Sequence, residues 1–374
     1  MSVMNLNITK IGIGNWRFRT LICQFALILG LALSLTVDAG AGTATERTVA
    51  NLPDIRLDAS FSCVNAKIAT AVPGEAEQLY EYARWLRRSE SQEYSAELES
   101  RIESFYRIAW AYGHDKAGRA LRYMLGEGHD LNQDSVAETL DLIGEAIRRD
   151  SPDGFFDMGR FLASGRGVRL DNELSWKYYR KSADLGSPQG LDLMGEALTN
   201  YGSPSSENIA TGFKMLRCAA EQGHGQAARK LAMALKAEKR HAEALKIFQL
   251  GVRNGNARSA SFLRAYMSGP APDSDLYYPA LKKDTERERR YAAIGAILSE
   301  YREYGATVPE IDQIVPLPPA KLPPWDGKLQ WLEAHKANLP PPLPSEEHIA
   351  EMARAKGLDP KTGRPLVSSA VKGR

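Results

Sequence analysis

The chain has 374 residues and a mass of 41.3 kDa, and 43% of its side chains are apolar and 25% charged. This composition can form a large core, which excludes a wholly disordered chain and a polytopic membrane protein. Lys and Arg number 48 against 46 Asp and Glu, so the chain has no broad basic surface for nucleic acid.

The first 39 residues have the organisation of a secretory signal. Lys10, Arg17 and Arg19 precede an apolar run over residues 21–37, and small residues follow around Ala39. Cleavage after Ala39 leaves 45 basic and 45 acidic residues, and we expect a soluble periplasmic protein with no stable membrane insertion. The alternative is a retained anchor, because a run of 17 residues is long for a signal core and short for a membrane span.

Two cysteines remain after such cleavage, because Cys23 leaves with the signal and Cys63 and Cys218 stay. In an oxidising compartment they could form a disulfide, and the alternative is two buried thiols. No paired Cys or His spacing offers four ligands to zinc. We therefore expect no metal and no cofactor. An extended segment over residues 40–74 is predicted to lead into the next region.

Self-similar turns recur along residues 75–304. The equivalent positions Gly113, Asp150, Gly186, Gly223 and Gly255 are separated by steps of 37, 36, 37 and 32 residues. Between them, apolar residues return at three and four positions, as on a helix. This period predicts an all-α array of helical hairpins.

The clearest unit covers residues 154–185. Gly165 and Gly167 are expected to end its first helix and Asp171 to cap its second, on which Trp176, Tyr179 and Ala183 share one face. A hairpin of this size cannot bury its apolar stripe alone. Successive hairpins should therefore stack into a solenoid.

This unit resembles the Sel1-like repeat, a relative of the tetratricopeptide repeat. The resemblance rests on Met158, Gly159, Leu162, Gly165, Arg166, Gly167, Val168, Asp171, Trp176, Lys181, Ser182, Ala183 and Gly186. It covers roughly residues 76–267, with about four internal repeats and a degenerate first hairpin over residues 76–112. It implies a right-handed solenoid.

A Pro-rich tail follows at residues 305–374, where ten of the twenty prolines fall between Pro309 and Pro344. Such a run favours extended backbone, although an aromatic turn near Trp325 should lead into a brief helix and Ser345 should cap another that Gly357 ends. A disordered tail is the alternative. The apolar side chains of this segment favour short helices that pack on the solenoid.

The tail segments 322–331 and 358–365 look like the ending of a family of exported bacterial Sel1-repeat proteins. Some members of that family are immunity proteins against type VI secreted antibacterial phospholipase effectors. The resemblance implies a periplasmic immunity protein whose partner is such an effector.

Catalytic motifs are absent from the sequence. It has no Gly-x-Ser-x-Gly elbow and no His-Glu-x-x-His. The six histidines are expected at turns or on exposed polar helices without ligand spacing: His114, His129, His224, His241, His335 and His348. We therefore expect no enzyme.

A protein-binding surface is the remaining prediction. In the related tetratricopeptide architecture the first helix of each hairpin lines the concave face, and two rows can be read there. The rows are Arg119, Phe156, Asp192 and Arg229, and, four residues later, Tyr123, Arg160, Glu196 and Met233. Trp325 and Trp331 are further candidates. The alternative is that half of the row residues pack against neighbouring repeats.

Three functional hypotheses follow. The first is a non-catalytic immunity protein that binds a phospholipase effector. The second is a periplasmic Sel1-repeat scaffold or regulator of an endogenous partner. The third is an enzyme resembling the cysteine-rich Sel1 proteins linked to β-lactam binding, but those have a disulfide in every repeat, and two mature cysteines argue against it.

Overall fold

The computed structural model describes residues 61–65, 72–88, 95–127, 133–200, 205–270 and 281–366. Within these ranges the chain forms helices and no strand, which confirms the predicted all-α class. None of these helices is both long and apolar enough to cross a membrane. The predicted signal at residues 1–39 lies outside the described residues.

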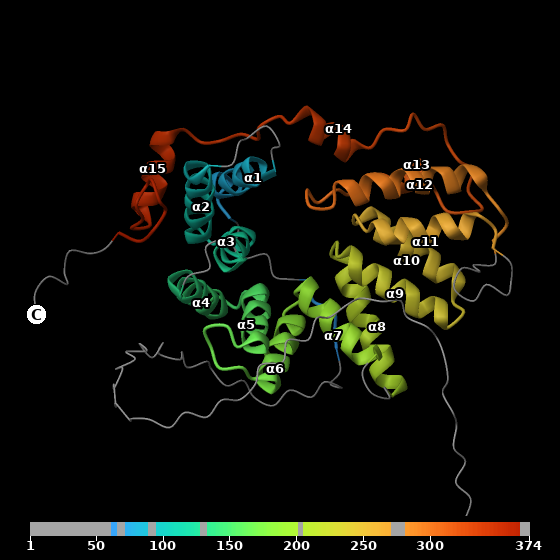
Figure 1. The fold of residues 1–374 in the computed structure, drawn as a ribbon, viewed down its shortest axis with the longest axis horizontal. Coiled ribbons are helices and arrows are strands. Elements are labelled where there is room, and N and C mark those ends of the chain that lie inside the picture. Colours follow the sequence, from blue (N-terminus) through green and yellow to red (C-terminus); the bar gives the residue numbers. More distant parts are fainter. Residues whose placement is uncertain are drawn as a thin grey trace, which may run out of the picture. The chain divides into compact units, whose positions relative to one another are not determined.

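Helices α1 to α12 pack in consecutive pairs, and each pair packs on the next (Figure 1). The pairs are α1 (Gly74–Arg88) with α2 (Ala96–Ala111), α3 (Asp115–Glu127) with α4 (Gln133–Arg148), α5 (Pro152–Ser164) with α6 (Asn172–Asp184), α7 (Pro188–Asn200) with α8 (Ser206–Glu221), α9 (Gly225–Ala237) with α10 (His241–Arg253), and α11 (Ala257–Met267) with α12 (Thr285–Glu300). The predicted solenoid of helical hairpins is confirmed.

The repeat unit formed by α5 and α6 has the predicted helix boundaries. Gly165 ends α5 with a φ of 67°, and Asp171 caps α6 by accepting a hydrogen bond from the Leu174 backbone N–H at 2.9 Å. Gly159 allows α5 and α6 to approach closely, since a Cβ there would lie 2.6 Å from the Tyr179 ring. The glycine next to Met158 is therefore a packing requirement of the hairpin.

The pair α11 and α12 is a further hairpin beyond the range predicted from the repeat resemblance, which ended at residue 267. Its second helix carries fully buried Tyr291, Ile294 and Leu298. A connection over residues 268–284 separates the two helices and interrupts the repeat period. The predicted array over residues 75–304 therefore includes this hairpin, although the repeat resemblance does not extend over α12.

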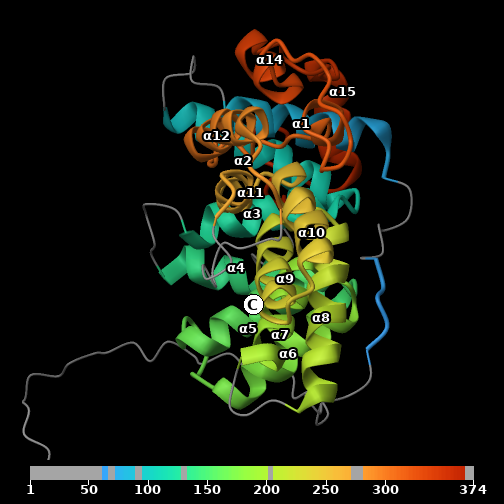
Figure 2. The ribbon, with the colours of Figure 1, turned by 90° about the vertical axis from the view of Figure 1, so that its right-hand side faces the viewer.

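The tail contacts both ends of the array. Near the last hairpin, the short helix α13 (Ile311–Ile314) and buried Val308 and Val315 join the core that contains α10 to α12. Helix α14 (Gln330–Ala337) follows, and α15 (Glu346–Ala355) buries Ile349 and Met352 against the core of α1 to α3. Figure 2 shows α14 and α15 beside α1. In the structure the tail therefore contains short helices and packs on both ends of the array.

A disulfide joins Cys63 to Cys218 on α8, with the two Cα atoms 5.7 Å apart. It attaches the segment 61–65 to the fourth hairpin, where Phe61 packs against the same apolar core. Of the two alternatives that the sequence left open, the structure contains the bridge.

Candidate protein-binding surface

The first helices α3, α5, α7 and α9 carry the eight row residues, and we call their shared face the first-helix surface. Along it, α5 contacts α7 and α7 contacts α9. Arg119 and Tyr123 lie on α3, and Tyr123 is 49% exposed. Arg160 of α5 is also exposed. These three side chains are the part of the two rows that a partner can reach most easily.

The α7 end of this surface is internally paired. Lys230 of α9 donates from Nζ to Asp192 Oδ2 at 2.7 Å and to Glu196 Oε2 at 2.6 Å. Asp192 is only 9% exposed. Lys230 lies one position after Arg229 and is not among the residues predicted from the sequence. Asp192 and Glu196 therefore fit the alternative prediction, in which row residues pack against neighbouring repeats.

The remaining row residues are partly covered. Phe156 packs against Tyr179 with ring centres 5.4 Å apart, and Met233 is half-buried against the main core. Arg229 is half-buried, and burial, followed by the nearby charge of Arg258, lowers the pKa of its guanidinium. Arg258 lies on the neighbouring helix α11 and is exposed.

A cavity of about 150 Å³ lies between α3, α4 and α5, and we call it the α3–α5 cavity. Arg119, Tyr123, Phe156 and Arg160 line it, so the structure brings four predicted residues to one place. Arg122 lines it too and was not predicted. Its position three residues after Arg119 on the same helix places it beside the rows.

The two tail tryptophans form a separate group. Trp331 stacks on His335 with ring centres 4.9 Å apart and meets the edge of Tyr301 at 5.9 Å. Trp325 donates from Nε1 to the Lys328 carbonyl at 2.8 Å, and the guanidinium of Arg290 lies over its ring. These contacts attach the tail to α12, and neither tryptophan lines the α3–α5 cavity.

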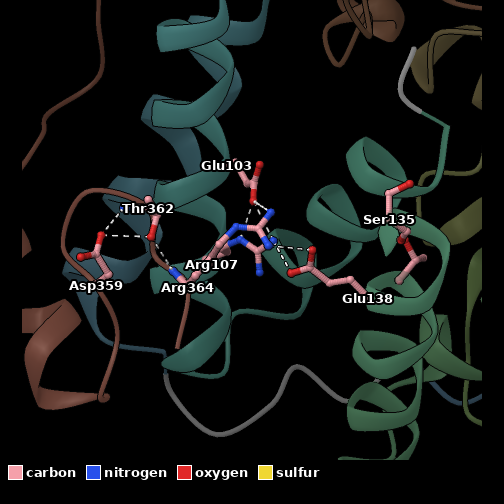
Figure 3. Close-up of polar contacts among 8 residues, drawn as sticks. Glu103, Arg107, Ser135, Glu138, Asp359, Thr362 and Arg364 are labelled. Atoms are coloured by element: carbon pink, nitrogen blue, oxygen red, sulfur yellow. Dashed lines mark hydrogen bonds and ion pairs between the residues drawn. The ribbon is translucent and has the colours of Figure 1, made fainter. Parts of the chain in front are cut away.

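The tail ends in an ion-pair cluster, which we call the tail clasp, formed by Arg364, Glu103, Arg107 and Glu138 (Figure 3). Arg364 donates to Glu103 of α2 at 2.9 Å and to Glu138 of α4 at 3.0 Å. Buried Arg107 lies between the same two carboxylates. The clasp therefore joins the tail to two hairpins at once.

A turn positions Arg364 in the clasp. Asp359 Oδ1 accepts from the Thr362 backbone N–H at 2.8 Å and from its hydroxyl at 3.0 Å, as Figure 3 shows. Gly363 has a φ of 65° and lies against α2, where a Cβ would come within 2.8 Å of the Arg107 Cβ and the Ser104 carbonyl. These contacts give the tail segment 358–365 its structural role.

Two histidines cap helices. His114 Nδ1 accepts from the Ala117 N–H at 3.1 Å, and His224 Nδ1 accepts from the Ala227 N–H at 3.2 Å. His114 lies at the turn between α2 and α3, where it is 3% exposed beneath the Tyr80 ring. Its cap position at a tightly packed hairpin turn requires this burial.

Comparison with known protein families identifies the repeats. A Sel1 repeat model matches residues 156–187 and 189–224. Residues 156–224 therefore contain Sel1 repeats. A second model, a domain of unknown function (DUF6396), matches residues 259–366, which run from the last hairpin through the tail to the clasp. No curated protein sequence matches the chain.

Three solved structures from Pseudomonas aeruginosa have a fold similar to that of this chain. The immunity protein Pa5087 is 24% identical with a TM-score of 0.54, over 70% of this chain and 95% of that one. PA5086 is 26% identical with a TM-score of 0.53, over 69% and 95%. The immunity protein PA5088 is 24% identical with a TM-score of 0.53, over 69% and 94%. The likeness covers nearly all of each neighbour.

Proposed function

We propose that this Sel1-repeat protein is a periplasmic immunity protein that binds and neutralises a type VI secreted antibacterial phospholipase effector. The observation that carries the proposal is the extent of the structural likeness to Pa5087 and PA5088, both described as immunity proteins. The likeness covers 95% and 94% of those chains, so it includes more than a generic repeat. The resemblance of the tail segments 322–331 and 358–365 to the ending of a family that includes immunity proteins also supports the proposal.

The mode of action is stoichiometric occlusion, not catalysis. An exposed aromatic and two exposed arginines on the first-helix surface are residue types that commonly dominate protein interfaces. Neutralising a toxin requires tight binding, about nanomolar or better, and a repeat array offers the contact area for it. If the protein protected the cell by an enzymatic reaction, it would instead need reactive side chains arranged as an active site.

Export is part of the proposal. The basic segment and apolar run at residues 1–39 predict a signal, and a disulfide such as Cys63–Cys218 persists in an oxidising compartment. A phospholipase delivered to the periplasm would meet its inhibitor there. Protection should therefore be lost when residues 1–39 are deleted.

The test is co-expression with any secreted phospholipase that is found encoded beside this gene. Cells should survive periplasmic toxin only with the exported protein, and the purified pair should form a stable complex. The triple variant Arg119→Glu, Arg160→Glu and Arg229→Glu should weaken binding by several kcal/mol, about 2–5 if these groups meet acidic residues. The matched control reverses three exposed arginines elsewhere: Arg169, Arg302 and Arg354.

Two outcomes would contradict the proposal. Full affinity in the triple variant would reject the first-helix surface and move the site to the tail or loops. No complex with any adjacent secreted phospholipase would reject immunity, and a periplasmic scaffold for an endogenous partner would then be the better hypothesis.

A further inference from the structure

Arg122 has a buried guanidinium of which only one nitrogen is paired. The residue is 3% exposed, and its Nε donates to Asp157 Oδ2 at 2.7 Å. Its two terminal nitrogens are buried and have no hydrogen-bond partner. A guanidinium has five N–H donors, and leaving buried donors of a charged group unpaired is costly. Both terminal nitrogens of Arg122 therefore lack an acceptor.

The surroundings of Arg122 are strongly cationic. The α3–α5 cavity is lined by four arginines, Arg119, Arg122, Arg160 and Arg166, and by one carboxylate, Asp157. Arg166 also has a buried terminal nitrogen, Nη2, without a hydrogen-bond partner. Two unsatisfied guanidinium ends at one small cavity indicate a site for an anionic acceptor.

The cavity size and walls restrict the class of ligand. About 150 Å³ is below the range of roughly 300–1,000 Å³ typical of small-molecule pockets, so the site suits a single side chain. Tyr123 and Phe156 supply aromatic walls, and a planar carboxylate pairs with a guanidinium in a two-pronged geometry. The low polarity of these walls strengthens that pairing.

We propose that the α3–α5 cavity binds the carboxylate of an Asp or Glu side chain presented by the partner protein, held by Arg122 and Arg166. This inference rests on the proposed function in one respect, because it takes the occupant to be part of a protein. It assigns a specific anchor to the first-helix surface and adds two residues that the repeat rows did not contain.

The first test measures the affinity for the cognate phospholipase. Arg122→Gln should weaken binding by about 100-fold, since truncating one member of a buried charge pair costs that much at protein interfaces. Arg166→Gln, at a less buried position, tests the same site if Arg122→Gln fails to fold. The matched control is Arg180→Gln: Arg180 of α6 is 2% exposed and its Nε contacts Asp184 at 2.9 Å, but it does not line the cavity.

The second test locates the carboxylate on the partner. One surface Asp or Glu of the phospholipase, changed to its amide, should weaken binding, and its effect should not add to that of Arg122→Gln. The proposal is overturned if the loss of affinity from every acid-to-amide change in the phospholipase adds independently to the loss from Arg122→Gln. It is also overturned if the Arg122→Gln and Arg180→Gln variants bind equally well.

A third test is independent of the proposed function. Titration of the purified protein with N-acetylglutamate should shift the arginine side-chain NMR signals of Arg122 and Arg166, and Arg122→Gln should abolish the response. Inorganic phosphate is titrated separately as a second anionic probe. A response to phosphate alone would replace the carboxylate by a phosphate group, and no response to either probe would reject an anion site. These results stand even if no phospholipase binds.

Discussion

Arg364 in the tail and Glu103 on α2 are 261 positions apart in sequence and form a 2.9 Å hydrogen-bonded ion pair. The Arg364 side chain is 49% exposed, so this pair alone contributes little, roughly 1 kcal/mol or less. Its effect comes from the position of the whole turn, in which Gly363 packs on α2 and places the guanidinium between two carboxylates. The glycine, more than the charge, should therefore decide whether the tail stays attached.

Gly363→Ala should detach the tail turn. The substitution adds a Cβ at a φ of 65° and within 2.8 Å of two α2 atoms, so we expect both backbone strain and a clash. Together they should cost about 2–4 kcal/mol, and hydrogen exchange should rise over residues 346–366. Gly357→Ala is the matched control, with a φ of 68° and no neighbour within 4 Å. Equal losses in the two variants would show that the contact with α2 is unimportant.

Gly159→Ala should destabilise the third hairpin. The new methyl group would overlap the Tyr179 ring at 2.6 Å, and overpacking of this kind costs about 1–3 kcal/mol. Gly144→Ala on α4 is the control, because its nearest neighbour is the flexible end of Arg148 at 3.5 Å. That variant should gain about 0.5–1 kcal/mol of helix stability. Urea unfolding measures both, and opposite signs are expected.

His224 should make stability depend on pH. Burial lowers the pKa of its imidazole below the ordinary value of 6.5, Asp192 raises that pKa and Lys230 lowers it further. A lowered folded-state pKa means that the unfolded chain binds the proton more tightly. The stabilising contribution of the neutral ring is therefore complete above about pH 6.5 and is lost as the pH falls through the folded-state value.

The measurement compares urea unfolding at about pH 7.5 and about pH 5 in wild type and His224→Asn. Asparagine keeps a helix-capping acceptor and has no titrating ring, so this part of the pH dependence should disappear. An unchanged pH profile in His224→Asn would assign the effect to other groups.

Removing the Cys63–Cys218 bridge should lower stability substantially. The bridged residues are 155 positions apart, and chain-entropy models give about 4–5 kcal/mol for loops of this length. The variant with Cys63→Ser and Cys218→Ser should unfold at lower urea, and reduction of the wild type should reproduce that midpoint. If protein from the periplasm has two free thiols by peptide mapping, the bridge is absent in the cell.

The local parts of the fold could be predicted from the sequence because their signals are local. Gly165, Asp171 and Ser345 act within a few residues of their positions, and the structure shows each at the predicted helix boundary. The repeat resemblance stopped at residue 267 because the connection between α11 and α12 is longer than in the other repeats. The tail clasp could not be predicted, since partners separated by 226 and 261 positions leave no periodic signal.

The candidate site was predicted only in part, for a similar reason. Reading equivalent positions along the repeats found Arg119, Tyr123, Phe156 and Arg160, which line one cavity. It placed Asp192 in the same row, although Lys230 from the next repeat neutralises it. Arg122 was not predicted because its candidate role rests on terminal nitrogens without hydrogen-bond partners, which only the three-dimensional structure shows.

The tail has a consequence for how this repeat protein should unfold. A linear repeat array frays from its ends, because each terminal repeat has only one neighbour and opens at little cost. Here α15 covers the first hairpin, and residues 306–332 cover the last one. Both terminal hairpins thereby gain a second neighbour from the same continuous segment. Opening at one end should then loosen the other, so that the array melts as one cooperative unit, as a globular domain does.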